Sequence, residues 1–307
     1  MSFQRVAVIG LGLLGGSIGL AVREHLPGVA TTGFDSDVAV RERARERALC
    51  DGIVDDPAEA VRGADLVILC VPVGAMEAAA RDIAPGLDPD AVISDVGSSK
   101  LSVARSLAKV LPDHTIIPAH PVAGTEQSGP DAGFASLFHQ RWCILTPPAG
   151  APPQKVKALE EFWQALGSTV EVMDAEHHDM VLAVTSHIPH LIAYTIVGTA
   201  SDLEEVTRSE VIKYSAGGFR DFTRIAASDP VMWRDVFLNN RDAVLEMMDR
   251  FLTDLGMMRE AIRAGDGEMM FDQFSKTRAI RRRIIEQGQD DARPDFGRHD
   301  HDPEDSE

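Results

Sequence analysis

Cysteine is scarce in this sequence: the chain of 307 residues contains only Cys50, Cys70 and Cys143. These residues are widely separated and match neither a metal-binding spacing nor a paired framework, which excludes a zinc module and a disulfide-stapled fold. No run of about 18 apolar residues stands out, which argues against a membrane span. The amino terminus lacks a charged region followed by a cleavage site and leads directly into an apolar strand, so we expect a cytoplasmic protein.

Basic residues are also in short supply, with 30 Lys and Arg against 48 Asp and Glu and a formal net charge of −18. This balance argues against a nucleic-acid partner, which needs clustered Lys and Arg. It also means that an anionic substrate requires a local basic pocket. Residues 289–307 have almost no apolar content, and we expect them to form a disordered acidic tail.

Apolar runs alternate with helical patterns in the first half of the chain, as in a parallel sheet covered by helices. The expected strands are 5–10, 30–35, 64–71, 91–96, 115–119, 142–146 and 169–173, with 142–146 at an edge. The expected helices of the second half are 175–200, 203–213, 230–264 and 267–287. The sequence therefore predicts an α/β domain of Rossmann type, with a doubly wound parallel sheet, over 1–174. An all-helical domain over 175–288 follows, and its long apolar helix faces predict a homodimer.

A glycine-rich loop, Gly10-Leu11-Gly12-Leu13-Leu14-Gly15, follows the first expected strand and opens a helix. This context is what a dinucleotide-binding fingerprint requires. Gly10 permits a tight turn, Gly12 lets the backbone approach a pyrophosphate, and Gly15 lets the helix and strand pack closely. The free amides at the start of the helix then face the phosphates. A glycine turn in another doubly wound fold is the alternative.

The type of dinucleotide is indicated by Asp35, which lies 20 residues beyond Gly15 at the end of the second expected strand. A carboxylate there accepts hydrogen bonds from the ribose hydroxyls and repels a 2′-phosphate, which favours NAD over NADP. Arg41 and Arg43 leave partial tolerance of NADP open, although a solvated helix face is the favoured interpretation. Further predicted cofactor-binding residues, at the ends of two other strands, are Val71, Pro72, Asp95 and Gly97.

Four short segments beyond this loop concentrate polar residues. They are Asp95-Val96-Gly97-Ser98-Ser99-Lys100, His120-Pro121-Val122-Ala123-Gly124-Thr125-Glu126, Ser186-His187-Ile188-Pro189-His190, and Gly217-Gly218-Phe219-Arg220-Asp221-Phe222-Thr223-Arg224 followed by Asp229-Pro230-x-x-Trp233. The first two lie at the carboxyl ends of expected strands, where open α/β sheets bind ligands. A neutral His120 there can accept a hydroxyl proton while hydride leaves the same carbon, and Ser98 can hydrogen-bond the same oxygen. From position alone, a loop histidine that binds backbone carbonyls is equally consistent.

Together these segments resemble the prephenate/arogenate dehydrogenases, enzymes of tyrosine biosynthesis that carry out an oxidative decarboxylation. The resemblance covers about residues 4–285 and is most specific in HPVAGTE and GGFRDFTR. It implies a Rossmann-type domain followed by a helical dimerisation domain. The implied activity is the NAD-dependent oxidation of prephenate, of arogenate or of both.

The resemblance also implies a role for each matching residue. His120 is expected to be the catalytic histidine at the ring hydroxyl, and Ser98 to contact both that hydroxyl and the histidine. Arg224 is expected to bind a substrate carboxylate, and His190 to lie near the substrate side chain. The other expected substrate-binding residues are His187, Ser99, Gly124, Thr125 and Trp233. His178 and Asp179 match a supporting His-Asp pair.

Two other functions remain as alternatives. Another two-domain NAD-dependent hydroxyacid dehydrogenase would share the glycine loop but should lack the HPVAGTE and GGFRDFTR segments. A catalytically silent NAD-binding sensor would be favoured by loss of His120 or Ser98, and both are present. No metal is expected, because His187 and His190 lack a third ligand nearby in the sequence and hydride transfer needs no metal.

Overall fold

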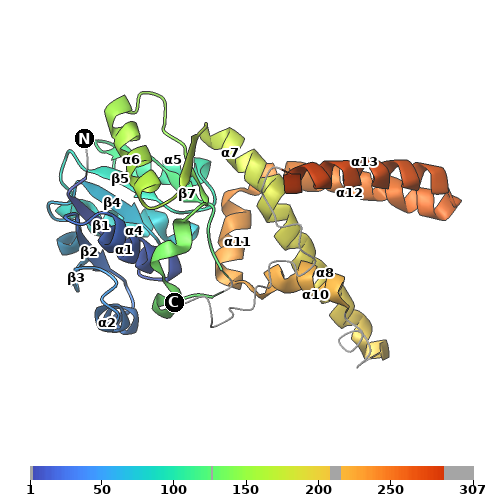
Figure 1. The fold of residues 1–307 in the computed structure, drawn as a ribbon, viewed down its shortest axis with the longest axis horizontal. Coiled ribbons are helices and arrows are strands. Elements are labelled where there is room, and N and C mark those ends of the chain that lie inside the picture. The colour runs from blue at the N-terminus through green and yellow to red at the C-terminus, as the bar shows by residue number, and fades with distance from the viewer. Residues whose placement is uncertain (1–2, 126, 208–215, 287–307) are drawn as a thin grey trace. The chain divides into compact units, whose positions relative to one another are not determined.

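The structure is a computed structural model that describes residues 3–125, 127–207 and 216–286 (Figure 1). It divides into two compact units. Of the described residues, 3–125, 127–197 and 225–245 belong to the first, and 198–207, 216–224 and 246–286 belong to the second. The expected boundary after residue 174 therefore falls inside the first unit and stays a prediction. The expected acidic tail, 289–307, and the end of the expected helix 203–213 lie outside the described residues.

A six-stranded parallel sheet with strand order β3-β2-β1-β4-β5-β6 forms the centre of the first unit. Its strands are β1 (Arg5–Ile9), β2 (Ala30–Phe34), β3 (Gly52–Ile53), β4 (Leu66–Leu69), β5 (Val92–Asp95) and β6 (Thr115–Ile116). The order reverses between β1 and β4, which is the topology of a doubly wound fold. The predicted Rossmann-type architecture is confirmed.

Helices cover both faces of this sheet because its strands are apolar on both sides. Val6 and Val8 of β1 join one buried cluster, whereas Ala7 and Ile9 join another. The first cluster includes residues of α1 and α6, and the second includes residues of α4 and α5 (Figure 1). The helices of this part are α1 (Leu13–His25), α2 (Val38–Glu46), α3 (Pro57–Ala60), α4 (Met76–Ile83), α5 (Leu101–Val110) and α6 (Pro153–Ala165).

A second, three-stranded sheet carries His120. Its order is β7 (Ala119–Pro121), β8 (Trp142–Leu145) and β9 (Thr169–Val172), so β8 is the central strand and the expectation that it lies at an edge is wrong. The chain changes sheets at Pro118, which has no amide hydrogen to donate. The preceding residue, Ile117, donates its amide hydrogen to Ile93, whereas the carbonyl of Pro118 accepts from Thr146 beside β8. The single strand expected over 115–119 is thereby split.

The helical part contains two breaks that the periodicity did not predict. Between α7 (Ala175–Leu182) and α8 (Ile188–Thr207) lies a π-helical turn, Ala183–His187. Pro189 is the second residue of α8, and a proline ring inside a helix prevents the regular hydrogen-bond pattern of the preceding turn. The second break, at Asn240, separates α11 (Pro230–Asn239) from α12 (Arg241–Ala264).

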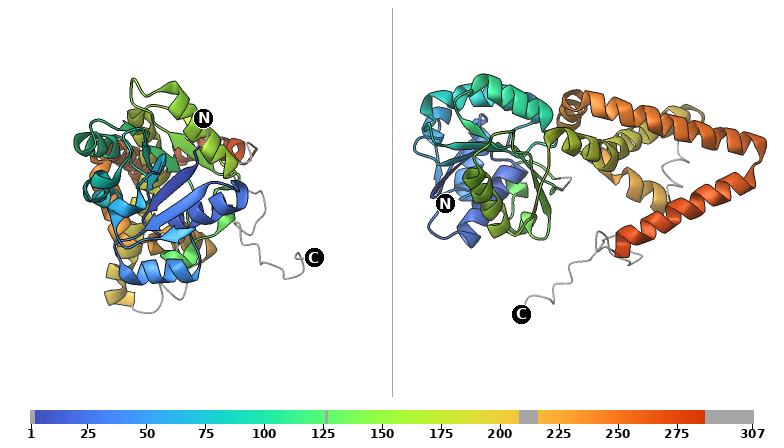
Figure 2. Two further views of the ribbon diagram at one scale, coloured as in Figure 1. Left: turned by 90° about the vertical axis from the view of Figure 1, so that its left-hand side faces the viewer. Right: turned by 90° about the horizontal axis from the view of Figure 1, so that it is seen from above.

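The second unit contains α10 (Gly217–Thr223) and α13 (Gly267–Glu286) together with the carboxyl-terminal parts of α8 and α12. Helices α12 and α13 run in opposite directions and are joined by a short turn at Gly265 (Figure 2). Gly265 has a φ of 69°, which a residue without a side chain adopts at little cost.

One helical stretch, Ala175–Asp202, is long and apolar enough to cross a membrane, by length and composition alone. It contains no unbroken run of 18 apolar residues, and the expectation of no membrane span stays a prediction. Core helices of soluble proteins pass the same test. The first half of this stretch carries three buried polar residues, His178, Asp179 and His187, which hydrogen-bond to other segments of the first unit.

Candidate active site

The glycine loop has the geometry of a dinucleotide cradle. Gly10 adopts a φ of +99°, and a Cβ there would lie 2.5 Å from the carbonyl oxygen of Cys70. A Cβ on Gly15 would lie 1.8 Å from the carbonyl oxygen of Gly10, so both positions require glycine. Gly12 faces open space, and its side has room for a pyrophosphate. No side chain caps the start of α1, which leaves amide hydrogens available to an anion.

Asp35 connects the end of β2 to this loop. Its carboxylate accepts the amide hydrogen of Leu11 at 2.8 Å and that of Asp37 at 2.9 Å. Val71, at the end of β4, lies on the other side, with a methyl group 3.1 Å from the position of a Cβ on Gly10. The loop, Asp35 and Val71 therefore lie together at the carboxyl end of the sheet, as predicted for a nucleotide site.

The two arginines considered for a 2′-phosphate are already engaged. Arg41 is buried, and this differs from the expected solvated helix face. Its guanidinium group donates to Asp55 at 2.8 Å and to the carbonyl oxygen of Asp35 at 2.7 Å. Arg43 is half-exposed and pairs with Glu46 and Asp131, each at 2.7 Å. Neither arginine is left without an acidic partner, which favours a dinucleotide that lacks the extra phosphate.

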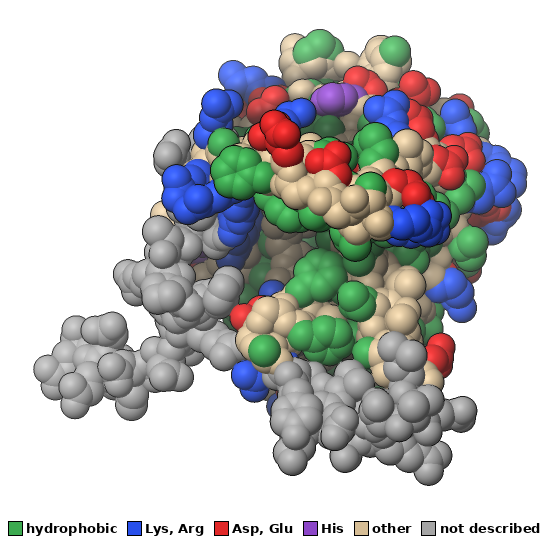
Figure 3. All heavy atoms as spheres, turned by 90° about the vertical axis from the view of Figure 1, so that its right-hand side faces the viewer, with side chains coloured by type: hydrophobic (Ala, Val, Ile, Leu, Met, Phe, Trp, Pro, Cys, Tyr) green, Lys and Arg blue, Asp and Glu red, His purple; other side chains and the backbone are tan. Residues whose placement is uncertain are grey.

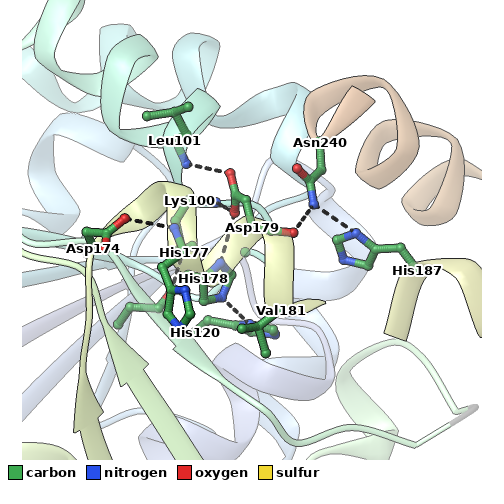
Figure 4. Close-up of polar contacts among 12 residues, drawn as sticks. Lys100, Leu101, His120, Asp174, His177, His178, Asp179, Val181, His187 and Asn240 are labelled. Atoms are coloured by element: carbon green, nitrogen blue, oxygen red, sulfur yellow. Dashed lines mark hydrogen bonds and ion pairs between the residues drawn. The ribbon is translucent and has the colours of Figure 1, made fainter. Parts of the chain in front are cut away.

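His120 lies on β7 and is buried. Its Nδ1 lies 2.9 Å from Nε2 of His178, and the two rings meet edge to face (Figure 4). The Nδ1 of His178 lies in turn 2.8 Å from Oδ1 of Asp179. Because a carboxylate accepts, His178 donates from Nδ1 and its Nε2 accepts a hydrogen from Nδ1 of His120. The Nε2 of His120 is then left with a lone pair.

The carboxylate of Asp179 is held in place by backbone amides. Oδ1 accepts from the amide of Lys100 at 2.7 Å, and Oδ2 accepts from the amide of Leu101 at 3.0 Å. These residues form the start of α5, so the free amides of that helix bind the carboxylate. The chain Asp179–His178–His120 is thus anchored at its carboxylate end. It has the arrangement in which an acid fixes the tautomer of a catalytic base.

Burial keeps His120 uncharged. Desolvation lowers the pKa of His120 well below its ordinary value, and the nearby His178, Lys100 and His187 lower it further. Burial also lowers the pKa of His178, although Asp179 opposes that shift. A histidine that is neutral at neutral pH, with the lone pair on Nε2, can accept a proton from a hydroxyl group.

An ion pair between Lys100 and Asp95 lies beneath this cluster, and both side chains are fully buried. Nζ of Lys100 also donates to the carbonyl oxygen of Ala119 at 2.6 Å, and Asp95 accepts the amide hydrogen of Ala119 at 3.3 Å. The ion pair therefore holds both the amide and the carbonyl group of Ala119, the residue directly before His120. Burial lowers the pKa of Lys100 and raises that of Asp95, and the ion pair opposes both shifts.

Of the predicted cofactor residues, Asp95 is the last residue of β5 and Gly97 lies in the loop that follows. The buried carboxylate of Asp95 accepts the amide hydrogen of Gly97 at 2.8 Å and so helps to fix the conformation of this loop. Ser98 is half-buried in the same loop. Ser99 is fully buried, and its hydroxyl group has no hydrogen-bond partner in the described part of the chain. The expected contact of Ser98 with the substrate hydroxyl stays a prediction.

A group of aromatic rings adjoins the histidine cluster. The ring of His190 stacks on Trp233 with centroids 3.7 Å apart, and its Nδ1 donates to the carbonyl oxygen of Ser186 at 2.8 Å. His187 lies edge-on to Trp233, with centroids 6.1 Å apart. The structure therefore brings together three of the predicted substrate-binding residues, His187, His190 and Trp233.

The other predicted substrate-binding residues are not placed beside this group. Gly124 and Thr125 lie exposed in the loop after β7, where the hydroxyl group of Thr125 accepts the amide hydrogen of Gln127 at 3.2 Å. Pro72, which was predicted to bind the cofactor, follows β4, and its carbonyl oxygen accepts the amide hydrogen of Ala75. Arg224 belongs to the second unit. Their roles stay predictions.

Comparison with known proteins identifies the family. Residues 18–172 match the nucleotide-binding domain of prephenate dehydrogenase, and residues 174–276 match its dimerization domain. The chain belongs to the prephenate dehydrogenase family. It is therefore an oxidoreductase, and the predicted family is confirmed.

Several relatives of this family cover nearly the whole chain. The cyclohexadienyl dehydrogenase of Zymomonas mobilis is 46% identical over 279 residues, which are 91% of this chain and 95% of the relative. The prephenate dehydrogenase of Bacillus subtilis is 34% identical over 90% of this chain and 75% of its own length. The crystal structure of the Aquifex aeolicus prephenate dehydrogenase in complex with hydroxyphenyl propionate and NAD+ is 31% identical, with a TM-score of 0.85. It matches 93% of this chain and 99% of its own.

Two residues of the site, Lys100 and Asn240, were missed by the sequence analysis, and the environment of a third, Arg41, was predicted wrongly. Lys100 lies inside a quoted motif, but a lysine before an apolar helix gives no sign of complete burial. Arg41 was assigned to a solvated helix face because its neighbours are charged. Asn240, which contacts both Asp179 and His187, lies within what the periodicity predicts as one continuous helix. No signal in a single sequence marks these contacts, since they arise only from tertiary packing.

Proposed function

We propose that this enzyme catalyses the NAD-dependent oxidative decarboxylation of prephenate, of arogenate or of both, in tyrosine biosynthesis. The observation that carries the proposal is the chain Asp179–His178–His120, which leaves a buried, neutral imidazole with its lone pair on Nε2. Such a base is needed where a ring hydroxyl loses its proton as hydride leaves the same carbon. The names of the relatives support this choice of substrates.

NAD, when bound, supplies the acceptor for the hydride. His120 takes the hydroxyl proton at Nε2 while the C–H bond of the same carbon breaks. The bond to the ring carboxylate then breaks, its electron pair completes the aromatic ring, and His120 returns the proton to the ring oxygen. Carbon dioxide and a phenol leave. Because aromatisation supplies the driving force, the protein contributes mainly orientation and the positioned base.

The residues of the glycine loop fit NAD. We assign the amides at the start of α1 to the pyrophosphate and Asp35 to the adenosine ribose hydroxyls. Asp35→Asn is expected to reduce the ratio of kcat/KM for NAD to that for NADP at least about tenfold, because it removes the charge that repels a 2′-phosphate. Steady-state kinetics with both dinucleotides measures this ratio. Asp37→Asn is the matched control, since Asp37 caps α2 and lies two residues away. An unchanged ratio in the Asp35 variant would contradict the assignment.

Arg224 is proposed to bind a substrate carboxylate. Arg224→Ala is expected to raise the KM for the substrate about 10- to 100-fold with a smaller effect on kcat, because a charge-assisted hydrogen bond to the bound substrate is lost. Arg220→Ala, four residues earlier on α10, serves as the control and should leave KM nearly unchanged. An unaltered KM in the Arg224 variant means that another basic residue holds the carboxylate.

A homodimer is proposed to form through the helical unit. Large apolar side chains of this unit are exposed, and Figure 3 shows hydrophobic side chains between charged ones on one face of the molecule. The exposed large apolar side chains of the helical unit include Leu252, Leu255, Ile262, Phe271 and Phe274. Exposed apolar helix faces of this extent mark association surfaces. We place the dimer in the cytoplasm, without a membrane or nucleic-acid partner. Light scattering should give twice the chain mass of 33.3 kDa, whereas a single-chain mass would contradict the dimer.

Turnover tests the proposal against its two alternatives. The purified enzyme is mixed with NAD and either prephenate or arogenate, and NADH is followed by its absorbance. Formation of NADH with at least one of these substrates is expected, and the ratio of the two kcat/KM values gives the preference. Activity with neither substrate, while simple hydroxyacids are oxidised, would favour another hydroxyacid dehydrogenase. NAD binding without any turnover would favour a sensor.

A further inference from the structure

Asn240 occupies the break between α11 and α12 and is buried. Its side-chain nitrogen, Nδ2, donates to the carbonyl oxygen of Asp179 at 2.8 Å and lies 3.1 Å from Nδ1 of His187 (Figure 4). Asp179 is thus linked to His120 and to His187, in each case through one intervening side chain. Its carboxylate reaches His120 through His178, and its carbonyl group reaches His187 through Asn240.

The orientation of the Asn240 amide follows from its partners. A carbonyl oxygen can only accept, so the atom next to the Asp179 oxygen must be the amide nitrogen rather than the amide oxygen. The second hydrogen of that nitrogen points to Nδ1 of His187, which therefore acts as an acceptor. Burial lowers the pKa of His187 to about 4, so the ring is neutral at neutral pH. Its single proton must be on Nε2.

This tautomer leaves an unused hydrogen-bond donor. Nε2 of His187 is buried and has no hydrogen-bond partner among the described residues, and the same is true of Nε1 of the neighbouring Trp233. A buried donor without an acceptor costs about 1–3 kcal/mol, so two such donors in contacting rings call for an acceptor from outside the chain. Two nitrogen donors without a charge suit an oxygen with lone pairs, such as that of a carboxylate.

We propose that Asn240 is a positioning residue that fixes His187 in the form protonated on Nε2, so that this N–H group can donate to a carboxylate oxygen of the substrate. Asn240 itself touches neither substrate nor cofactor. The identity of the substrate rests on the proposed function, whereas the tautomer of His187 does not. Asn240 was not among the residues expected from the sequence, and only the break between two helices places its side chain between α7 and the π-helical turn.

The tautomer can be measured directly in the ligand-free protein. Nitrogen-15 NMR of the histidine rings distinguishes a proton on Nε2 from one on Nδ1, and the His187→Gln variant assigns the signals by their loss. The wild-type ring is expected to carry its proton on Nε2. In Asn240→Asp a carboxylate replaces the donor, and the proton is expected to move to Nδ1. Asn239→Asp is the matched control, because Asn239 donates to the carbonyl oxygen of Asp235 rather than to His187, and it should leave the ring unchanged.

Kinetics supply the second readout. Loss of the Nε2 donor in Asn240→Asp is expected to raise the substrate KM about 10- to 100-fold, with little change in the KM for NAD and a smaller effect on kcat. Asn239→Asp should keep both values. A merely structural role for Asn240 would instead lower the melting temperature without the change in tautomer. If Asn240→Asp does not fold, Asn240→Leu replaces it, and a mixture of both tautomers is then expected.

Two results would overturn the proposal: a wild-type His187 ring protonated on Nδ1, or an Asn240 variant whose ring remains entirely protonated on Nε2. A substrate KM that does not change while the tautomer does would also overturn it, because the donor would then not reach the substrate. If neither prephenate nor arogenate is oxidised, the proposed function fails. The ring tautomers of the wild-type and variant proteins then still decide whether Asn240 positions His187.

Discussion

His120→Asn is expected to lower kcat by about 10²- to 10⁴-fold, which is the usual contribution of a positioned general base. Asparagine retains polarity and approximate size but cannot take up the hydroxyl proton. The KM for NAD should change little, because His120 is not part of the glycine loop. Steady-state kinetics on the purified variant measures both values. His177→Asn is the matched control, since His177 is exposed beside His178 and should retain full activity. Near-normal turnover of the His120 variant would remove this residue from the mechanism.

The dependence of kcat/KM on pH tests the same residue in the wild-type enzyme, because this ratio reports the pKa values of the free enzyme. The neutral form of His120 is the base, so kcat/KM should rise as pH increases through its pKa and then level off. Because burial and the adjacent His178, Lys100 and His187 lower that pKa, the fall in kcat/KM should begin only below the usual pH range of histidine titration. A midpoint at or above the ordinary histidine value would contradict the account of a desolvated base.

Lys100→Met is expected to lower the free energy of unfolding by about 3–5 kcal/mol, because it leaves the buried carboxylate of Asp95 without its charged partner. Denaturant unfolding measures this loss. Lys109→Met is the matched control on α5, the helix that begins directly after Lys100, since Lys109 is exposed and its pair with Glu77 lies at the surface. Its effect should remain below about 1 kcal/mol. A Lys100 variant as stable as the Lys109 variant would show that the buried pair contributes little.

Lys100→Met should also disturb the position of His120 in the active site. Lys100 and Asp95 hold the amide and carbonyl groups of Ala119, directly before His120, so the strand that carries His120 loses one anchor. The double variant Asp95→Asn/Lys100→Met removes the unpaired charge and should recover part of the lost stability, as replacement of a whole buried ion pair often does. Further destabilisation by the second substitution would mean that Asp95 does not depend on Lys100.

The architecture of the first unit could be predicted from sequence because local patterns determine it. Apolar runs bounded by turns mark the strands, and the glycines at 10, 12 and 15 mark the turn after β1. The separation into two sheets could not be predicted in this way. The run 115–119 is apolar after Thr115 and shows no interruption, and the change of partner at Pro118 depends on β8, which follows far along the chain. The same dependence places β8 in the middle of its sheet.

The candidate site, too, could be predicted from sequence only in part. Motifs identified His120, His178, Asp179, His187, His190 and Trp233, because residues that carry chemistry recur in recognisable segments. The proton positions on these rings could not be derived from motifs. They depend on contacts between segments far apart in the chain, such as His120 with His178 and Asn240 with His187. Complete burial, as for Lys100, is likewise a property of the packed structure.

The central claim is that one bound substrate loses hydride and carbon dioxide in the same catalytic cycle. It is tested most directly with prephenate or arogenate labelled in the ring carboxylate, by measuring labelled carbon dioxide and NADH in a single reaction mixture. The account predicts one carbon dioxide for each NADH, with a 4-hydroxyphenyl product, and loss of both signals together in His120→Asn. NADH formed without labelled carbon dioxide would contradict it.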